Sequence, residues 1–244
     1  MIEEVTGIVV SEHNYGEKSK IINILTKEKG IIGIMVKGGR SLKSSLRSVT
    51  GKLTYGTFNI FYKKDKLSKL IEVTILDNLN NIKKNIDLIS YASYLVDLAY
   101  QVTRHSNNQL VFDNLINGLK KINEGYNPDV ITNILELKYL DNLGVLPVLD
   151  SCVECGSVNN IVTLSSDRGG YLCSNCRTNE PIISSKSIKL LRLYYYVDIS
   201  KINNIDVNKN IVREINDFLD NYYERYTGLY LKSKDFLKNL KNLG

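Results

Sequence analysis

The sequence predicts an α+β protein with a small β-barrel over residues 1–80 and an α-helical domain over residues 81–244. Three observations support this fold class. The first eighty residues contain five short runs rich in Ile, Val, Thr and Tyr, whereas apolar residues recur at helical spacing from Asn85 onward. A pair of C-x2-C motifs then interrupts the helical part, which predicts a four-cysteine zinc finger at residues 150–180.

Five strands are predicted in the N-terminal part, separated by turn-forming residues such as those around Gly16 and Gly30. The predicted strands are Val5–Ser11, Ser19–Thr26, Gly30–Val36, Lys52–Tyr62 and Lys66–Leu76. Five short strands in about eighty residues are typical of the OB-fold, a barrel that commonly binds nucleic acid or sugars. An SH3-like barrel fits the number of strands equally well.

Positive charge is concentrated in the predicted barrel. The formal net charge is +6, and residues 1–80 contain 13 Lys or Arg and 8 Asp or Glu, a net +5. Between Lys29 and Lys64, both included, there are eight basic residues and no acidic one. A one-sided field of this kind suits a polyanion, although a solvated surface that lacks acidic residues explains the charge equally well.

Residues 37–47, named here the basic segment, form the most informative loop of the barrel. Gly38 and Gly39 allow the backbone to turn closely past a ligand. The basic side chains can bind phosphates without reading bases, so we expect affinity without sequence preference. The candidate nucleic-acid-binding residues are Lys37, Arg40, Lys43 and Arg47.

Aromatic side chains on neighbouring segments offer surfaces on which unpaired bases could stack. Aromatic residues at alternating strand positions more often belong to a core, so both roles stay open. The candidates are Tyr15, Tyr55, Phe58, Phe61 and Tyr62.

The helical part begins with two amphipathic helices, which a polar break at residues 106–108 separates. A third helix, over roughly Pro128–Leu143, has Asn127 as its N-cap and Gly144 beyond its end. Three more helices are predicted after the cysteines, at Ser187–Val197, Lys209–Tyr226 and Lys234–Leu240, the last with Ser233 as its cap.

All four cysteines of the chain lie in one stretch: Cys152 and Cys155, then seventeen residues, then Cys173 and Cys176. Two residues between thiols allow one tight turn to present both sulfurs to a tetrahedral ion, at about 2.3 Å. Four thiolates leave no open coordination position, so we expect structural rather than catalytic Zn²⁺. Degenerate metal binding and redox chemistry are the alternatives.

The sequence also favours a cytoplasmic protein. No signal segment precedes Glu3 and Glu4, so we expect reduced thiols rather than two disulfides. No run approaches the eighteen apolar residues of a membrane span, so we expect no membrane insertion.

We expect no enzymatic activity. The only histidines, His13 and His105, lie in different predicted domains without a neighbouring carboxylate motif. The sequence Lys37-Gly-Gly-Arg40 lacks the frame of a P-loop. It faintly resembles the lysine motif of polynucleotide ligases, but the acidic residue of that motif is missing.

In order and spacing, these features resemble the bacterial RecO family of recombination mediators over nearly the whole chain. The basic segment resembles that family's basic loop, and the cysteines resemble the ligands of its zinc-binding members. The flanking motifs are Gly7-Ile-Val-Val10, Tyr15-Gly-Glu17, Ile21–Thr26 and Leu231-Lys-Ser-Lys234. His13-Asn14 stands where many members are basic, which weakens one phosphate contact.

The resemblance implies an N-terminal OB-fold, a helical domain with an embedded zinc finger, and binding to single- and double-stranded DNA. It further implies strand annealing, partnership with RecR, and help in loading RecA onto DNA coated by single-strand binding protein (SSB), at the nucleoid of a bacterial cytoplasm. It assigns DNA contact to Lys37, Arg40, Lys43 and Arg47, and metal binding to Cys152, Cys155, Cys173 and Cys176.

Two other hypotheses stay open. The first is a protein adaptor whose helical domain binds repair or replication partners, with DNA contact secondary. The second is a translation- or transcription-associated OB and zinc module, which would prefer structured RNA to single-stranded DNA because of the 2′-hydroxyl.

Overall fold

The computed structural model describes residues 1–106, 108–203 and 205–243. It divides into two compact units, of which the first comprises Met1–Leu119 with Ser233–Gly244 and the second comprises Lys120–Lys232. None of the described helices combines the length and the apolar character that crossing a membrane requires.

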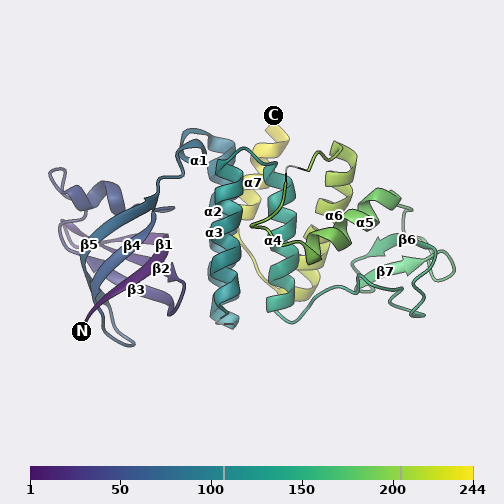
Figure 1. Cartoon of the computed structure of the whole chain (residues 1–244), viewed down its shortest axis with the longest axis horizontal. Coiled ribbons are helices and arrows are strands. Elements are labelled where there is room, and N and C mark those ends of the chain that lie inside the picture. Colours follow the sequence, from purple (N-terminus) through teal and green to yellow (C-terminus); the bar gives the residue numbers. More distant parts are fainter. Residues whose placement is uncertain (107, 204, 244) are drawn as a thin grey trace. The chain divides into compact units, whose positions relative to one another are not determined.

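Five strands of the first unit form a closed barrel in the order β1-β2-β3-β5-β4, with β1 paired to both β2 and β4 (Figure 1). The strands are β1 (Ile2–Tyr15), β2 (Ser19–Thr26), β3 (Gly30–Val36), β4 (Tyr55–Phe61) and β5 (Ser68–Asp77). β3 and β5 close the barrel in parallel, while the other pairs are antiparallel. The barrel is OB-like, which confirms the predicted fold of this part.

Alternate residues of the strands point into the barrel, as the period of two in a strand requires. Phe58 and Ile60 on β4 are fully buried, and so are Ile22 and Ile24 on β2. The complete core cluster is Val5, Val9, Ile22, Ile24, Ile32, Ile34, Val36, Phe58 and Ile60. These nine residues explain why the strand-like runs of the sequence fold into one barrel.

β1 is twice as long as the predicted strand Val5–Ser11 because it pairs with β4 from Ile2 and with β2 as far as Tyr15. Both ends of β1 carry charged and polar residues. The apolar pattern that predicts a strand is therefore missing there. A bulge between Val9 and Ser11 shifts the register with β2, which bends the strand.

Four helices belong wholly or largely to the first unit: α1 (Asn80–Lys84), α2 (Ile86–His105), α3 (Gln109–Asn123) and α7 (Lys232–Leu243). Asn85 caps α2, because its side chain accepts hydrogen bonds from the backbone of Asp87 and Leu88. α2 packs against β1 and β3. α1 has only five residues and was not predicted.

α7 differs from the prediction at its start. It begins at Lys232, so Ser233 lies inside the helix and is not its cap. Within the described part of the chain, the buried Ser233 hydroxyl has no hydrogen-bond partner. α7 lies on α2, where the Lys234 ammonium is 5.2 Å from the centre of the Tyr94 ring.

In the second unit, α4 (Pro128–Asn142), α5 (Ser185–Tyr196) and α6 (Lys209–Thr227) pack against one another. The predicted cap of α4 is confirmed, since the Asn127 side chain accepts hydrogen bonds from the backbone N–H groups of Asp129 (2.9 Å) and Val130 (3.4 Å). The remaining strands, β6 (Ile161–Ser165) and β7 (Gly170–Cys173), form a two-stranded antiparallel sheet between the two C-x2-C motifs. Residues 150–180, which include this sheet, are called the finger below.

Candidate metal centre and nucleic-acid interface

The finger brings the four cysteines together. The sulfur atoms of Cys152, Cys155, Cys173 and Cys176 all lie within 4.8 Å of one another. The distance between the sulfurs of Cys155 and Cys173 is 3.8 Å. A tetrahedral ion with metal–sulfur bonds of about 2.3 Å separates its ligands by about 3.8 Å, whereas a disulfide bond is about 2.05 Å long. The four thiols are therefore arranged so that they could hold a metal ion.

Each C-x2-C motif is a tight turn stabilised by its own backbone. In the first, which spans residues 152–155, the N–H of Gly156 donates to the carbonyl of Cys152 at 2.8 Å. Gly156 has a φ of 72°, a conformation that glycine adopts without steric cost. In the second, residues 173–176, the N–H groups of Cys176 and Arg177 donate to the carbonyl of Cys173 at 3.2 and 3.0 Å. These turns point both sulfurs of each pair to one side.

The turns also favour the thiolate at Cys152. Burial by itself raises the pKa of this thiol, but hydrogen bonds from the backbone N–H groups of Cys173, Cys155 and Glu154 outweigh it and lower the pKa to about 6. The thiolate is the form that binds a metal.

Cys176 shows the opposite shift, because hydrogen bonds with the side chains of Cys155 and Cys173 raise its pKa to about 12. Four crowded sulfurs cannot all carry negative charge unless a cation compensates it. The donor set therefore fits a thiolate-bound metal ion.

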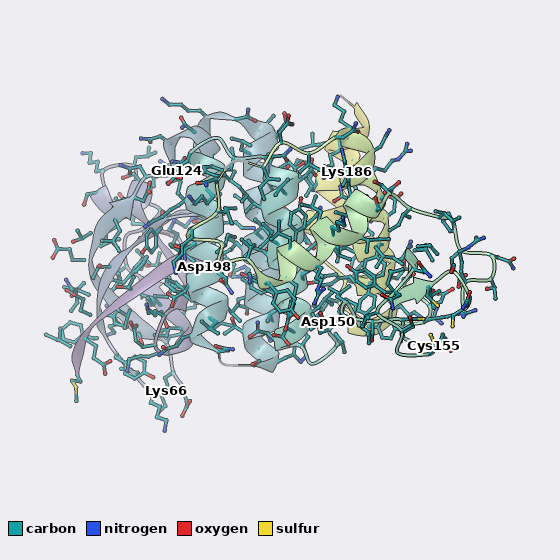
Figure 2. The ribbon with its side chains drawn as sticks, turned by 45° about the vertical axis from the view of Figure 1, so that its right-hand side comes forward. Lys66, Glu124, Asp150, Cys155, Lys186 and Asp198 are labelled. Atoms are coloured by element: carbon teal, nitrogen blue, oxygen red, sulfur yellow. The ribbon has the colours of Figure 1, made fainter. Side chains whose placement is uncertain are left out.

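The sulfurs differ in their access to solvent. Cys152 and Cys173 are buried, Cys176 is partly buried and Cys155 is exposed at the surface of the finger (Figure 2). The two buried cysteines form a small core with Leu172, and Val153 and Ile161 pack against it.

The basic segment follows β3 and leads into a short 3₁₀-helix, η1 (Ser45–Thr50). Lys37, Arg40, Lys43 and Arg47 are all exposed. Arg40 attaches the segment to the β1–β2 turn, because its backbone N–H donates to the carbonyl of Lys18 (3.0 Å) and its guanidinium Nη1 donates to the carbonyl of Gly16 (2.8 Å). The segment therefore has a defined position on the barrel.

The two glycines of the basic segment have a role in the turn itself. Gly38 has a φ of 69°, and a Cβ on Gly39 would lie 2.7 Å from Cγ1 of Val36. A larger residue at Gly39 would therefore displace the end of β3.

Four other basic residues of the barrel form ion pairs with nearby carboxylates. They are Lys20 with Glu12 (2.5 Å), Lys27 with Asp113 (3.0 Å), Lys29 with Glu3 (2.8 Å) and Lys52 with Asp97 (3.0 Å). In the part of the chain that the structure describes, none of the four candidate side chains in the basic segment forms an ion pair. The basic segment therefore retains positive charge that is free to bind an anion.

A second basic cluster lies on the hairpin between β4 and β5, and sequence reasoning did not single it out. Lys63, Lys64 and Lys66 are exposed there, and Figure 2 labels Lys66 at the surface. The run of lysines around Asp65 was the available signal.

The aromatic candidates separate into buried and exposed residues. Phe58 belongs to the barrel core, and the ring of Tyr55 packs 6.5 Å from that of Phe112. Tyr62 lies under the Lys29 ammonium, 4.5 Å from the ring centre. Tyr15 and Phe61 are 53% and 47% exposed, so their rings are accessible to a ligand.

Comparison with known proteins identifies the family. Residues 1–79 match the family model described as "Recombination protein O N terminal", and residues 83–235 match "Recombination protein O C terminal". The chain belongs to the RecO family. The resemblance predicted from the order of the motifs is thereby confirmed.

Among its RecO relatives is the DNA repair protein RecO of Bacillus pumilus (strain SAFR-032), 34% identical over 247 residues, which cover 100% of this chain and 96% of the relative. The protein of the same name from Bacillus subtilis (strain 168) has the same identity and coverage. That of Listeria monocytogenes serotype 4b (strain F2365) is 32% identical over 243 residues, 98% of this chain and 95% of the relative.

Proposed function

We propose that this RecO-family protein is a DNA repair and recombination mediator that binds single- and double-stranded DNA and anneals complementary strands. Its relatives are named DNA repair proteins, which supports a role in repair or recombination. The observation that supports DNA binding most directly is the basic segment on the OB-like barrel. Its four basic side chains are exposed, and none of them forms an ion pair within the described chain.

Lys37, Arg40, Lys43 and Arg47 would bind backbone phosphates, which fixes a strand on the barrel without reading its sequence. Arg40 keeps donors for a phosphate, because a guanidinium has five N–H groups and the carbonyl of Gly16 takes one of them. Tyr15 is exposed next to Gly16, so it is the best-placed aromatic residue for stacking on a base.

Annealing follows from the same electrostatics. Two complementary strands repel each other, and a positive surface that holds both lowers this repulsion and releases counterions. The process requires no nucleotide hydrolysis, and we assign no catalytic step to the protein.

We infer that the metal in the finger is Zn²⁺ and that its role is structural, because four cysteine ligands close the coordination sphere. Residues 1–80 would then act as the DNA-binding domain, and residues 81–244, interrupted by the finger, as a helical domain that positions partners. Family membership supports RecR and SSB as direct partners and RecA as an indirect one, in a bacterial cytoplasm at the nucleoid.

A double variant tests the DNA-binding surface. Lys37→Ala with Arg40→Ala should lower the affinity for single-stranded DNA roughly 10- to 100-fold at about 50 mM salt, equally for all sequences. The slope of log affinity against log salt should decrease by about 1.4, because two phosphate contacts are lost at about 0.7 each. Fluorescence anisotropy over a salt series measures both quantities.

The matched control is Lys186→Ala with Lys189→Ala, which removes two exposed charges from α5. It should bind DNA with nearly the wild-type slope. If the barrel variant keeps the wild-type affinity and slope, the basic segment is a solvated surface. The adaptor hypothesis would then be favoured, in which mediator function survives loss of the basic segment while partner binding persists.

A further inference from the structure

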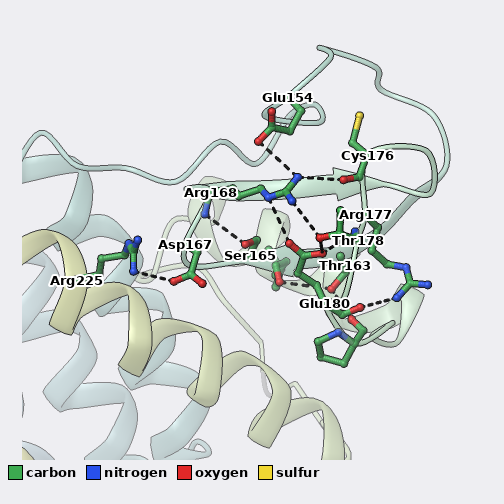
Figure 3. A network of polar contacts seen from close by, with 12 residues as sticks. Glu154, Thr163, Ser165, Asp167, Arg168, Cys176, Arg177, Thr178, Glu180 and Arg225 are labelled. Carbon is green, nitrogen blue, oxygen red and sulfur yellow. Dashed lines mark hydrogen bonds and ion pairs between the residues drawn. The ribbon is translucent and has the colours of Figure 1, made fainter.

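The turn between β6 and β7 carries an arginine that contacts both C-x2-C motifs (Figure 3). Nη1 of Arg168 donates to the carbonyl oxygen of Cys176 at 3.0 Å and lies 3.6 Å from Oε1 of Glu154. Glu154 stands between the two cysteines of the first motif, and Cys176 is the last cysteine of the second. One guanidinium therefore connects the two turns that present the sulfurs.

The other nitrogens of the guanidinium are also used. Nη2 of Arg168 donates to Oγ1 of Thr178 at 3.0 Å, and Nε lies 3.4 Å from Oε1 of Glu180. Figure 3 shows Arg168 at the centre of this network, with the Cys176 carbonyl facing it. A planar fork with five donors can make these contacts together, whereas a lysine ammonium cannot reproduce their geometry.

Glu180 is itself held in place. Its Oε2 accepts hydrogen bonds from the backbone N–H (2.9 Å) and the hydroxyl (3.2 Å) of Thr178, and its side chain is 18% exposed. The Thr178 N–H is the main cause of a pKa for Glu180 below its usual range, so the carboxylate stays charged opposite Arg168. The segment after Cys176 is thereby fixed against the β6–β7 turn.

The turn that carries Arg168 is also attached to a long helix of the same unit. Asp167 accepts a charged hydrogen bond from Arg225 on α6 at 2.8 Å, and the hydroxyl of Tyr226 donates to the Asp167 carbonyl at 3.2 Å. The guanidinium thus projects from a turn supported by a helix and not only by the metal ligands.

We propose that Arg168 is a positioning residue of the metal centre, which holds the two C-x2-C turns in their ligating arrangement and so raises metal affinity and slows metal release. This inference rests on the proposed metal centre. Outer partners of this kind orient the ligands, and their loss typically costs about 10- to 100-fold in metal affinity.

The test is zinc affinity, measured on the purified, reduced full chain by competition with a chromophoric chelator. Arg168→Gln should weaken zinc binding about 10- to 100-fold and accelerate release. Arg168→Lys should restore only a small part of the affinity, because it keeps the charge but loses the fork. The charge-transfer bands of the Co²⁺-substituted protein should shift in Arg168→Gln, which a change in overall stability would not cause.

Arg225→Gln is the matched control, since it removes an arginine that binds the same turn through Asp167 without contacting either C-x2-C motif. It should change zinc affinity less than about 2-fold. Wild-type affinity and wild-type Co²⁺ bands in Arg168→Gln would overturn the proposal, as would an equal loss in Arg225→Gln.

Wild-type zinc stoichiometry separates this proposal from the one on which it rests. If the wild type binds no zinc, the metal centre itself is wrong; if it binds zinc and Arg168→Gln binds equally, only the role of Arg168 is wrong. Should Arg168→Gln fail to fold, Thr178→Val removes the acceptor of Nη2 together with the hydroxyl hydrogen bond to Glu180, keeps the backbone N–H bond to that carboxylate, and should still weaken zinc binding several-fold. Unchanged affinity in that variant would also count against the proposal.

Discussion

The barrel buries nine apolar side chains in its core, whereas the core cluster around the cysteines of the finger contains three buried residues, two of which are cysteines themselves. The barrel strands each pair with two neighbours, while the finger has two short strands. Beside the β6–β7 sheet, the finger has a network of polar contacts centred on Arg168 (Figure 3).

The barrel is stabilised mainly by the burial of apolar side chains, whereas the finger depends more on polar contacts and on its cysteine cluster. Burying one Val, Ile or Phe side chain contributes about 1.5–3 kcal/mol, so the nine Val, Ile and Phe residues of this core can stabilise a closed barrel. The finger buries fewer apolar side chains, Leu172 beside the cysteines and Leu164 and Tyr171 on its two strands, and these contribute less to two turns and a hairpin. A structural zinc ion supplies about 10–16 kcal/mol of apparent binding free energy in zinc-finger peptides, and the proposed Zn²⁺ would contribute a stabilisation of this kind to the finger.

Loss of the metal ligands should have the largest effect and should be confined to the finger. Cys152→Ser, or chelation of the metal, should lower the free energy of opening of β6 and β7 by several kcal/mol, because metal binding and folding are coupled there. Hydrogen exchange measured by mass spectrometry should show faster exchange in residues 150–180 and unchanged protection in β1–β5. Equal loss of protection in the barrel would contradict the separation of the two regions.

Truncation of the barrel core should have the next largest effect and should spare the metal. Phe58 is fully buried, so Phe58→Ala should destabilise the protein by about 3–5 kcal/mol in urea denaturation. Phe61 lies on the same strand and is 47% exposed, so Phe61→Ala should change stability by less than about 0.5 kcal/mol. Zinc stoichiometry should stay at the wild-type value in both variants, and loss of zinc from folded Phe58→Ala protein would contradict the comparison.

The smallest expected effect is the pH dependence of the stability that the Lys29–Glu3 ion pair adds to the barrel. The hydrogen bond to Glu3 raises the pKa of Lys29 above its ordinary value of 10.5. A raised lysine pKa adds stability that is complete below the unfolded value and is lost as the pH rises through the folded value. The difference in melting temperature between wild type and Lys29→Gln should therefore be complete at about pH 9 and should shrink as the pH rises above about 10.4. Alkaline pH keeps the thiols ionised, so zinc should stay bound in this range.

Lys63→Gln is the control for this titration, since Lys63 is exposed and forms no ion pair within the described chain. Its melting temperature should follow the wild type at both pH values. A difference for Lys29→Gln that grows with pH would contradict the assigned ion pair.

The sequence predicted most features that depend on local spacing. The C-x2-C motifs placed the four sulfurs correctly, and Asn127 before Pro128 marked the start of α4. The alternating apolar residues identified the strands of the barrel, although charged residues concealed the ends of β1. Ser233 was wrongly expected to cap α7, because a serine two residues before Asp235 fits both a cap and a place inside the first turn.

Contacts between distant residues could not be predicted from the sequence. Lys52 continues the basic stretch of the sequence, but Asp97, 45 positions later on α2, neutralises it. Arg168 has no spacing signal either, because the hairpin brings Cys176 and Glu180 to it. The DNA-binding role of Lys37, Arg40, Lys43 and Arg47 remains a prediction that rests on exposure and unpaired charge.

The most direct test is the binding of fluorescent single-stranded DNA to the wild-type, zinc-loaded protein over a salt series, with duplex DNA and RNA of matching sequence as competitors. The account predicts binding at low salt with little sequence preference and a steep negative slope of about 0.7 per contacted phosphate. Negligible DNA binding at low salt would contradict it and favour the adaptor hypothesis. Stronger competition by structured RNA than by DNA would contradict it in favour of an RNA-binding module.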